Sequence, residues 1–390
     1  MTDVMVVAGA RTAIGDYGGA FKEVPATKLG AIAIREALAR AKADPASVGH
    51  VVMGSVIHGE ARDMYLSRVA AVDAGIPVGT PALTVNRLCG SGLQAIVSAA
   101  QHIMLGDTNI AVAGGAESMS RAAYMLPSGR WGQRMGDAPV IDAMTAALHD
   151  PFGHGHMGVT AENIAAKYGF TREQQDQYSV ESHKRAARAI EAGYFKSQIV
   201  PVELKSKKGV EQFTTDEHVR ADASMDNMAK LKAVFKKDGT VTAANASGIN
   251  DAGAAVVLMD AKAAKNYKPM ARLVAYAHAG VEPQVMGLGP IPAVKRVFEK
   301  AGLKPADMDV IESNEAFAVQ AMAVTKDLGL DPAKVNPNGG AVALGHPIGA
   351  TGCILTVKAL YELERTGKRY ALVTMCIGGG QGIAAIFERV

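Results

Sequence analysis

The chain has 390 residues, of which 48% are apolar, 20% charged and 5% aromatic. This apolar share is ample for a folded core and excludes an intrinsically disordered protein. The 41 Lys and Arg residues against 38 Asp and Glu residues leave a formal charge of +3, with both signs mixed along the chain. That balance excludes the strongly basic stripe of a nucleic-acid-binding protein, so we expect no nucleic-acid partner.

Neither the apolar runs nor the first residues suggest a membrane protein or an exported one. No apolar run approaches the ~18 residues of a membrane span, and the start, Met1 to Met5, lacks the basic region of a secretory signal. The three cysteines are too few at this length for a disulfide framework. We expect a cytoplasmic protein in a reducing compartment, where a free thiol can act as a nucleophile.

The first part of the chain alternates strand and helix patterns, which predicts an α/β fold. β-branched runs indicate the strands, and apolar residues at helical spacing indicate the helices. We expect strands at 4–8, 48–52, 82–85 and 110–113, and helices over 27–43 and after Gly92.

The last third repeats this order of elements at nearly the same spacing. Pro305 and Ala306 lead into a strand much as Pro45 and Ala46 do in the first part. The repeat indicates an internal duplication. Its expected elements are strands at 271–276, 310–311 and 370–375, a helix over 292–302, and a helix that begins within 345–352.

The segment between the two similar parts has a different character. One helix begins at a Thr171 cap with Glu173 and Gln174 in its first turn. The stretch 205–237 is loop-like and rich in Lys. A long insertion in a compact fold is usually functional. The sequence therefore predicts three parts, at 1–117, 118–248 and 249–390.

Candidate chemistry collects where strands meet glycines. Cys89 lies between a strand and a helix and is followed by Gly90 and Gly92. Free amides and the positive end of a helix favour the thiolate, so we expect a lowered pKa and a nucleophilic role. The glycines allow a carbonyl to approach the backbone, whose amides can hold its developing charge. The alternative is a buried structural cysteine.

Other polar residues occupy similar turns. His346 lies between Gly345 and a proline, where it is either an acid–base group or a turn histidine. Cys376 ends a strand before three glycines, whose amides would lower the pKa of its thiol, and is either a proton-transfer partner or a structural residue. Asn314 follows a buried strand, where it can orient a water, donate to an oxyanion or cap a helix. Cys353 is expected in the core.

Metal and nucleotide motifs are absent from the sequence. The spacing of His149, His154 and His156 matches no standard zinc pattern, and no cysteine lies nearby. The glycine runs form neither a GxGxxG motif nor a P-loop. We therefore expect no metal and no bound cofactor.

Four blocks in this order together resemble the thiolase family. They are Asn86-Arg87-Leu88-Cys89-Gly90-Ser91-Gly92-Leu93-Gln94, Asn314-Glu315-Ala316-Phe317-Ala318, Gly345-His346-Pro347-Ile348-Gly349-Ala350-Thr351-Gly352 and Cys376-Ile377-Gly378-Gly379-Gly380-Gln381-Gly382. The resemblance covers essentially the whole chain, and the bacterial β-ketothiolases that feed short 3-ketoacyl-CoA synthesis look most similar. Ser313 and Cys353 depart from the family pattern, which more often has alanine and a small residue there.

The resemblance implies a duplicated, layered αβαβα fold with two mixed five-stranded sheets and an inserted loop domain that holds coenzyme A. It also implies an acyltransferase that works by a ping-pong reaction between acetyl-CoA and an acyl-CoA, as a homodimer or homotetramer. Cys89 would carry the acyl group, His346 would take its proton, and Cys376 would exchange the α-proton of acetyl-CoA. Asn314, through a water, would form one oxyanion hole with His346. The amides of Cys89 and Gly378 would form the other.

The resemblance also places a set of residues beside coenzyme A or its acyl chain. Ser247 would meet the pantetheine amide, and Arg220 is a candidate for the nucleotide phosphates, since its planar fork suits them. The alternative for the apolar members is ordinary packing. The full set is Leu148, His156, Met157, Arg220, Phe235, Ser247, Met286 and Phe317.

Three other functions remain as alternatives. The same fold could cleave longer 3-ketoacyl-CoA chains in fatty-acid β-oxidation, and the sequence does not set the chain length or the direction of flux. A decarboxylating condensing enzyme would lack a second cysteine in a Cys-Ile-Gly-Gly-Gly turn. A non-catalytic acyl-CoA or lipid-binding module would have lost one of Cys89, Asn314, His346 and Cys376, and all four are present.

Overall fold

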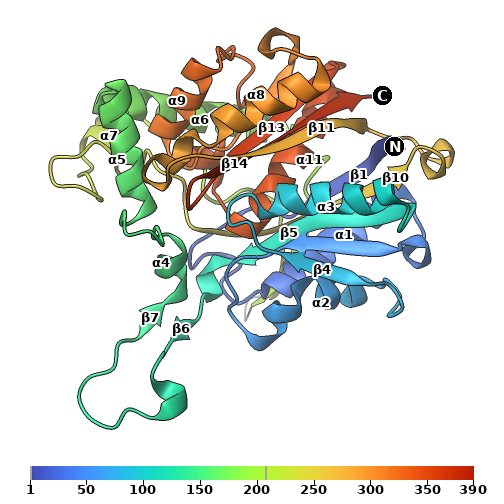
Figure 1. The fold of residues 1–390 in the computed structure, drawn as a ribbon, viewed down its shortest axis with the longest axis horizontal. Helices are drawn as coiled ribbons and strands as arrows, with labels where there is room; N and C mark the ends of the chain where they lie inside the picture. The colour runs from blue at the N-terminus through green and yellow to red at the C-terminus, as the bar shows by residue number, and fades with distance from the viewer. Residues whose placement is uncertain (1, 207–208) are drawn as a thin grey trace.

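The computed structural model describes residues 2–206 and 209–390. Its main feature is a 10-stranded sheet in the order β12-β13-β14-β11-β1-β10-β5-β3-β4, with β2 paired to β10 (Figure 1). The sheet strands are β1 Val4–Arg11, β2 Gly15–Asp16, β3 His50–Gly54, β4 Ala82–Val85, β5 Ile110–Ser118, β10 Asn250–Asp260, β11 Ala271–Gly280, β12 Val310–Ser313, β13 Tyr370–Ile377 and β14 Gln381–Arg389. The hairpin strands are β6 Tyr124–Met125, β7 Ile141–Asp142, β8 Val202–Ser206 and β9 Gly209–Phe213.

The helices lie between and around these strands. They are α1 Ala26–Ala41, α2 Leu66–Asp73, α3 Ser91–Leu105, α4 Ala143–Ala147, α5 Met157–Tyr168, α6 Arg172–Glu191, α7 Met225–Ala229, α8 Pro290–Ala301, α9 Ala318–Asp327, α10 Ala341–Leu344 and α11 Ile348–Thr366. The predicted alternation of strand and helix is confirmed, and the Thr171 cap forms a capping box with Gln174.

The two halves of the chain have the same strand order, as the predicted duplication requires. In the first half, β3 runs parallel to β4 and β5, and β10 then pairs antiparallel with β5 and β1. In the second half, β12 runs parallel to β13, and β14 then pairs antiparallel with β13 and β11. The strand that would correspond to β4 is reduced to one residue, Val335, which bridges Ile311 in parallel.

The expectation of two separate five-stranded sheets is therefore wrong in detail. The halves join edge to edge through β1 and β11, which share only the pairs Met5–Arg272 and Val6–Ala271. Two equivalent edge strands that meet across a pseudo-symmetry axis satisfy each other's free backbone groups, which an unpaired edge would leave open. The second half also lacks a full fifth strand in the described residues.

The helices confirm the five-layer arrangement. α1 and α2 cover one face of the first half, and α8 covers the opposite outer face of the second half. α3 packs against β3 and β5, α11 packs against β5, β10, β12 and β13, and the two helices pack against each other. α3 and α11 therefore form the middle layer. The first turns of the two helices lie side by side, since a Cβ on Gly92 would meet the backbone of Ala350 and Cys353.

The boundary between the two halves that strand pairing defines also differs from the predicted boundary at residue 249. β10 is buried along almost its whole length and lies between β1 and β5, so it belongs to the first half. A division by strand pairing consequently falls after Asp260. β10 is a continuous apolar run with no alternation, which is why its place in the sheet could not be deduced from its pattern.

The residues between β5 and β10 form the insertion. Helices α5, α6 and α7 gather on one side of the molecule, and the β6–β7 hairpin extends away from the body (Figure 1). The stretch 205–237 was expected to be a loop, but part of it forms β9 and α7. His218, Val234 and Phe235, from the same stretch, line the cavity described below.

One helix of the described residues is long and apolar enough to cross a membrane by length and composition, over Leu88–Leu105. The window is not a continuous apolar run, because Gln94, Gln101 and His102 interrupt it, so it does not contradict the expectation from the sequence. In the fold this helix is α3, and 56% of the window is buried in the protein. A helix in the middle layer is apolar on most sides because it packs against a sheet and another helix.

Candidate active site

Cys89 lies in a tight turn between β4 and α3. Leu88 has a left-handed backbone with φ of 43°, an uncommon conformation for a branched residue. The Ser91 hydroxyl stabilises the turn, since it accepts from the Arg87 amide at 2.9 Å and donates to the Leu88 carbonyl at 2.7 Å. The turn presents the thiol beside the first turn of α3, as the sequence predicts.

The electrostatics of Cys89 differ from the prediction. Burial raises the pKa of the Cys89 thiol to about 11, although the Gly378 amide acts in the opposite direction. The nearby Glu117 carboxylate raises this pKa further. The predicted lowering by glycine amides is therefore wrong for the substrate-free protein, because loss of water outweighs the amide dipoles. At rest Cys89 is therefore a thiol, and a nucleophilic role would require a base.

His346 is suited to be that base. Burial lowers the pKa of His346 to about 4, so the imidazole is neutral near pH 7. Its Nδ1 lies 2.6 Å from the Thr351 hydroxyl, which itself donates to the Pro347 carbonyl at 2.9 Å. Since the hydroxyl proton is engaged, Thr351 accepts from Nδ1–H, and Nε2 keeps its lone pair. The ring is held with its basic nitrogen toward Asn314.

Asn314 is buried and directly follows β12. Its backbone amide donates to the Thr374 carbonyl at 3.0 Å. Its Nδ2 lies 3.5 Å from Nε2 of His346. Its Oδ1 has no hydrogen-bond partner among the described residues. Asn314 and His346 thus place polar atoms at one point, which suits the predicted water-binding role.

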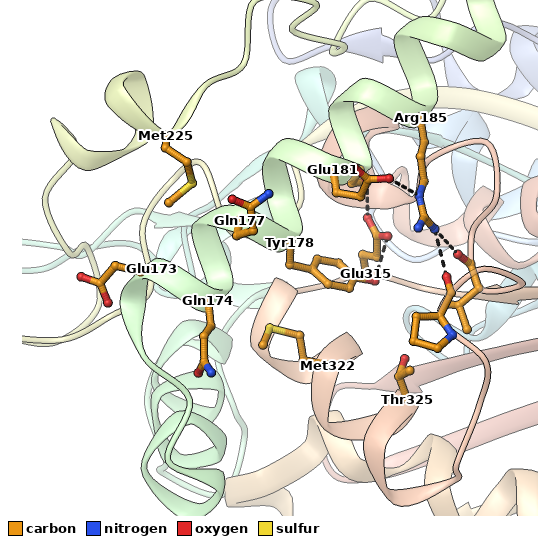
Figure 2. A pocket seen from close by; sticks show the side chains of 13 residues that line it. Glu173, Gln174, Gln177, Tyr178, Glu181, Arg185, Met225, Glu315, Met322 and Thr325 are labelled. Carbon is orange, nitrogen blue, oxygen red and sulfur yellow. Dashed lines mark hydrogen bonds and ion pairs between the residues drawn. The ribbon is translucent and has the colours of Figure 1, made fainter.

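Hydrogen bonds to the neighbouring Glu315 carboxylate hold the turn that carries Asn314 in place. Its carboxylate accepts from Tyr178 at 3.0 Å, Ser182 at 2.7 Å and Asn336 at 2.8 Å. Figure 2 shows Tyr178, on α6, reaching this carboxylate. The insertion therefore supports the turn that carries Asn314.

Cys376 is fully buried on β13, next to its last residue. Burial raises the pKa of the Cys376 thiol, and the charge of Cys89 raises it further, so the two sulfurs lie within electrostatic reach of each other. The expected lowering is wrong here as well. The chain then turns through Gly379 and Gly380, whose φ values are 82° and 88°. These left-handed positions favour glycine.

A cavity of about 410 Å³ lies against Cys89 and His346. Cys89, His346 and Gly378 form part of its wall, while Asn314 and Cys376 are not among its lining residues. A Cβ on Gly378 would lie 3.0 Å from Cε of Met157, so glycine keeps this wall open. Residues from both halves and the insertion therefore converge on one cavity.

Nearly all of the residues predicted to contact coenzyme A line this cavity. His156 stacks on Phe235 at 4.6 Å between ring centroids and forms an aromatic wall. Burial lowers the pKa of His156 to about 4. The predicted residues that line the cavity are Leu148, His156, Met157, Phe235, Ser247, Met286 and Phe317.

Arg220 is the exception among the predicted coenzyme A residues. It does not line the cavity, and its exposed guanidinium donates to Asp16 at 3.0 Å. His218, two residues earlier, lines the cavity instead and also contacts Asp16, at 2.9 Å. Neither the residue type nor the spacing of His218 indicated this position. It depends on how the insertion folds back onto β2.

A second cavity, of about 620 Å³, lies behind the Asn314 turn, on the side of Glu315. It is lined by residues of α6, α7 and α9, with Tyr178 and Glu315 at its inner end (Figure 2). None of the predicted catalytic residues lines it. Within residues 2–206 and 209–390, no group of three His, Cys, Asp or Glu residues is placed to hold a metal ion.

Comparisons with known proteins identify the family. A model of the thiolase N-terminal domain matches residues 4–262, and one of the thiolase C-terminal domain matches residues 267–389. The chain is 65% identical to the beta-ketothiolase BktB of Cupriavidus necator, with 100% of this chain and 99% of that protein covered. It is 50% identical to an acetyl-CoA acetyltransferase of the same organism, with 100% of both covered.

Solved structures agree with these matches. The human mitochondrial 3-ketoacyl-CoA thiolase superposes with a TM-score of 0.98 at 44% identity, with 100% of this chain and 99% of that chain covered. A structure of that human thiolase in complex with CoA gives a TM-score of 0.97 at 44% identity, with 100% and 98% covered. The sequence, the fold and the cavity shared by Cys89 and His346 all agree, and the chain belongs to the thiolase family.

Proposed function

We propose that this thiolase transfers an acyl group between coenzyme A thioesters, condensing acetyl-CoA with an acyl-CoA to 3-ketoacyl-CoA and cleaving that product in reverse. The observation that carries the proposal is the shared cavity of about 410 Å³, which has Cys89, His346 and Gly378 in its wall. It is a narrow, largely apolar site with few polar groups, as a pantetheine arm requires.

In the first half-reaction, Nε2 of His346 takes the Cys89 proton as the sulfur attacks the carbonyl carbon of acetyl-CoA. The tetrahedral intermediate collapses with cleavage of the bond to the coenzyme A sulfur. His346 then returns the proton to that sulfur, and acetyl-Cys89 remains. A neutral imidazole beside a protonated thiol is the pairing that this exchange needs.

In the second half-reaction, Cys376 removes an α-proton from a second acetyl-CoA, and the enolate attacks acetyl-Cys89. Acetylation supports this role, because it removes the possibility of a negative charge on Cys89 that would otherwise oppose ionisation of Cys376. Before this step the Cys376 thiol gives its own proton to Nε2 of His346, and His346 passes that proton to the Cys89 sulfur as the new 3-ketoacyl-CoA is released. Each turnover is thus balanced in protons.

Two sets of donors would stabilise the negative oxygen. The amide of Gly378 already interacts with Cys89, and with the Cys89 amide it would form one oxyanion hole. Asn314 and the protonated His346, with Nδ2 and Nε2 3.5 Å apart, would hold the other oxygen through a water. We propose no metal and no cofactor besides the coenzyme A thioesters.

Mass spectrometry after incubation with acetyl-CoA tests the covalent step. The tryptic peptide from Leu88 to Arg121 should gain one acetyl group on Cys89. Cys89→Ala should lose acetylation and turnover, whereas Cys376→Ser should still be acetylated but fail to condense. Acetylation at another residue would refute the assignment of the nucleophile.

The chain length and direction of the reaction form a finer proposal. Leu88, Met157 and Met286 line the cavity, and we propose that these side chains limit the acyl chain to short 3-ketoacyl-CoA products. A bacterial relative named acetyl-CoA acetyltransferase supports a role in acetyl-CoA chemistry, and we further propose synthesis within polyhydroxyalkanoate or fatty-acid metabolism as the context. Cleavage rates on 3-ketoacyl-CoA of increasing length test this. A preference for long chains would favour β-oxidation.

We also propose a homodimer or homotetramer in the cytoplasm. β4 is an edge strand with an exposed Leu83, and Tyr65 is 67% exposed in the neighbouring segment. On the extended β6–β7 hairpin, Trp131 and Met135 are 86% and 90% exposed. Two separate apolar surfaces suit two interfaces. Light scattering after gel filtration tests this, and a monomer would refute it.

A further inference from the structure

Glu117 is a buried carboxylate that the proposed mechanism does not use. It lies in the last part of β5 and is completely buried. Its Oε1 accepts from the Ile57 amide at 3.1 Å. Its Oε2 accepts from the amides of Val56 at 3.1 Å and Gly349 at 2.8 Å. One side chain thus joins three backbone segments.

These three segments come from both halves of the molecule. Val56 and Ile57 follow β3, in the first half, and Gly349 lies in the first turn of α11, three residues after His346. Cys89 belongs to the first half, and His346 to the second. The carboxylate therefore connects the half that carries the nucleophile to the loop that carries its base.

The backbones approach each other closely at this point. A Cβ on Gly349 would lie 2.7 Å from Oε2 of Glu117, and a Cβ on Gly54 would lie 2.7 Å from the Gly349 carbonyl oxygen. A Cβ on Gly115 would overlap the same carbonyl. Only glycine fits at these positions. A small movement of the Gly349 turn would therefore be transmitted along the loop to His346.

We propose that Glu117 is a positioning residue that fixes the His346 loop relative to Cys89 by accepting hydrogen bonds from Val56, Ile57 and Gly349. The inference rests on the proposed function, since it takes Cys89 as nucleophile and His346 as base. It concerns the reach and acceptor atoms of the side chain rather than its charge. Misplacement of a catalytic group by about 1 Å can cost roughly 100-fold in rate.

Three substitutions separate the length and acceptor atoms of the Glu117 side chain from its ability to ionise. Glu117→Gln keeps the length and one carbonyl oxygen, which can face Val56 and Gly349, but it cannot ionise. Burial raises the pKa of Glu117 to about 8, so near pH 7 the wild-type side chain is mostly neutral and Gln is a close electrostatic mimic. Glu117→Asp keeps an ionisable carboxyl group but is shorter by about 1.5 Å. Glu117→Met keeps the length and has no oxygen acceptor.

The experiment measures the single-turnover rate of Cys89 acetylation by acetyl-CoA and, separately, Cys89 alkylation by iodoacetamide at pH 8. We expect Glu117→Gln to acetylate within about threefold of the wild type, and Glu117→Asp and Glu117→Met to be slower by at least about 30-fold. Alkylation should slow in the Asp and Met variants, because the thiol is separated from its base.

The proposal would be overturned if the Asp variant were acetylated faster than the Gln variant. If charge were the determinant, Glu117→Asp would resemble the wild type. Glu117→Gln would instead be alkylated faster, since the carboxylate raises the pKa of Cys89. Wild-type acetylation rates in a folded Asp or Met variant would also refute the positioning role. If Glu117→Met fails to fold, the Gln and Asp variants alone decide the order.

Asp309→Asn is the matched control. Asp309 accepts from the amides of Arg369 and Tyr370, both at 3.0 Å, at the end of β13 opposite to Cys376. Replacing this carboxylate with an amide should lower the melting temperature but leave the acetylation and alkylation of Cys89 unchanged. Failure of the proposed function would appear differently, as a wild-type protein that is not acetylated on Cys89 at all.

Discussion

The hydroxyl of Thr351 is predicted to set the protonation pattern of His346, and Thr351→Val removes it with little change of shape. Thr351 is buried, and its oxygen lies 2.6 Å from Nδ1 of the imidazole. In the variant, a proton on Nδ1 would have no partner. The imidazole would then favour the form with the proton on Nε2, which cannot accept from Cys89.

The size of this effect follows from the cost of an unpaired buried donor, about 1–3 kcal/mol. That cost reduces the population of the base-competent imidazole, and it corresponds to roughly 5- to 160-fold in the acetylation rate. The assay is single-turnover acetylation of Cys89 by acetyl-CoA at pH 7.5, followed by mass spectrometry. Binding of acetyl-CoA should change little, because Thr351 does not line the cavity.

Thr356→Val provides a matched control on the same helix. Thr356 is also buried on α11, and its hydroxyl donates to the Gly352 carbonyl at 2.9 Å, as that of Thr351 does to Pro347. Both substitutions remove the same kind of helix contact, but only Thr351 contacts the imidazole. Equal acetylation rates in the two variants would refute the reasoning about the His346 proton.

Three further predictions concern pH and packing. Because the pKa of Cys89 is raised to about 11, alkylation of the substrate-free protein should rise about tenfold per pH unit from pH 7 to 10, and a plateau near pH 7 would contradict this. Because the pKa of His346 is lowered to about 4, the stability that it contributes is complete above about pH 6.5 and is lost as pH falls to 4, by up to about 3 kcal/mol. Urea unfolding should show a smaller pH dependence in His346→Gln, and an unchanged one would exclude this contribution. Gly115→Ala should destabilise the fold by about 1–3 kcal/mol or more, since its Cβ would overlap the Gly349 carbonyl, whereas Gly79→Ala meets nothing within 4 Å and should melt like the wild type.

The sequence predicted many elements to within a few residues. The strand at 82–85 coincides with β4, and the expected helix over 27–43 corresponds to α1, Ala26–Ala41. These predictions succeeded because apolar periodicity and glycine breaks are local properties of the chain. β10 and α5 were not anticipated, because the apolar residues of β10 do not alternate and α5 lies inside the insertion.

The positions of the catalytic candidates were also local information, but their electrostatics were not. Cys89 and Cys376 were each identified from a strand end followed by glycine. The sign of their pKa shifts was predicted wrongly, because the sequence shows the nearby amides and not the exclusion of water. The resemblance placed Arg220 near coenzyme A, and in the fold its side chain lies outside the cavity and pairs with Asp16.

The sequence by itself determined the alternation of strand and helix, the duplication, and which side chains stand at the turns where chemistry is possible. Only the tertiary structure decided that the two halves share one sheet, that His218 rather than Arg220 faces the cavity, and that Glu117 ties the His346 loop to the first half. The physical reason is that periodicity and turn preference act between neighbours in the chain. Burial, strand pairing and hydrogen bonds across more than two hundred residues depend on the whole packed molecule.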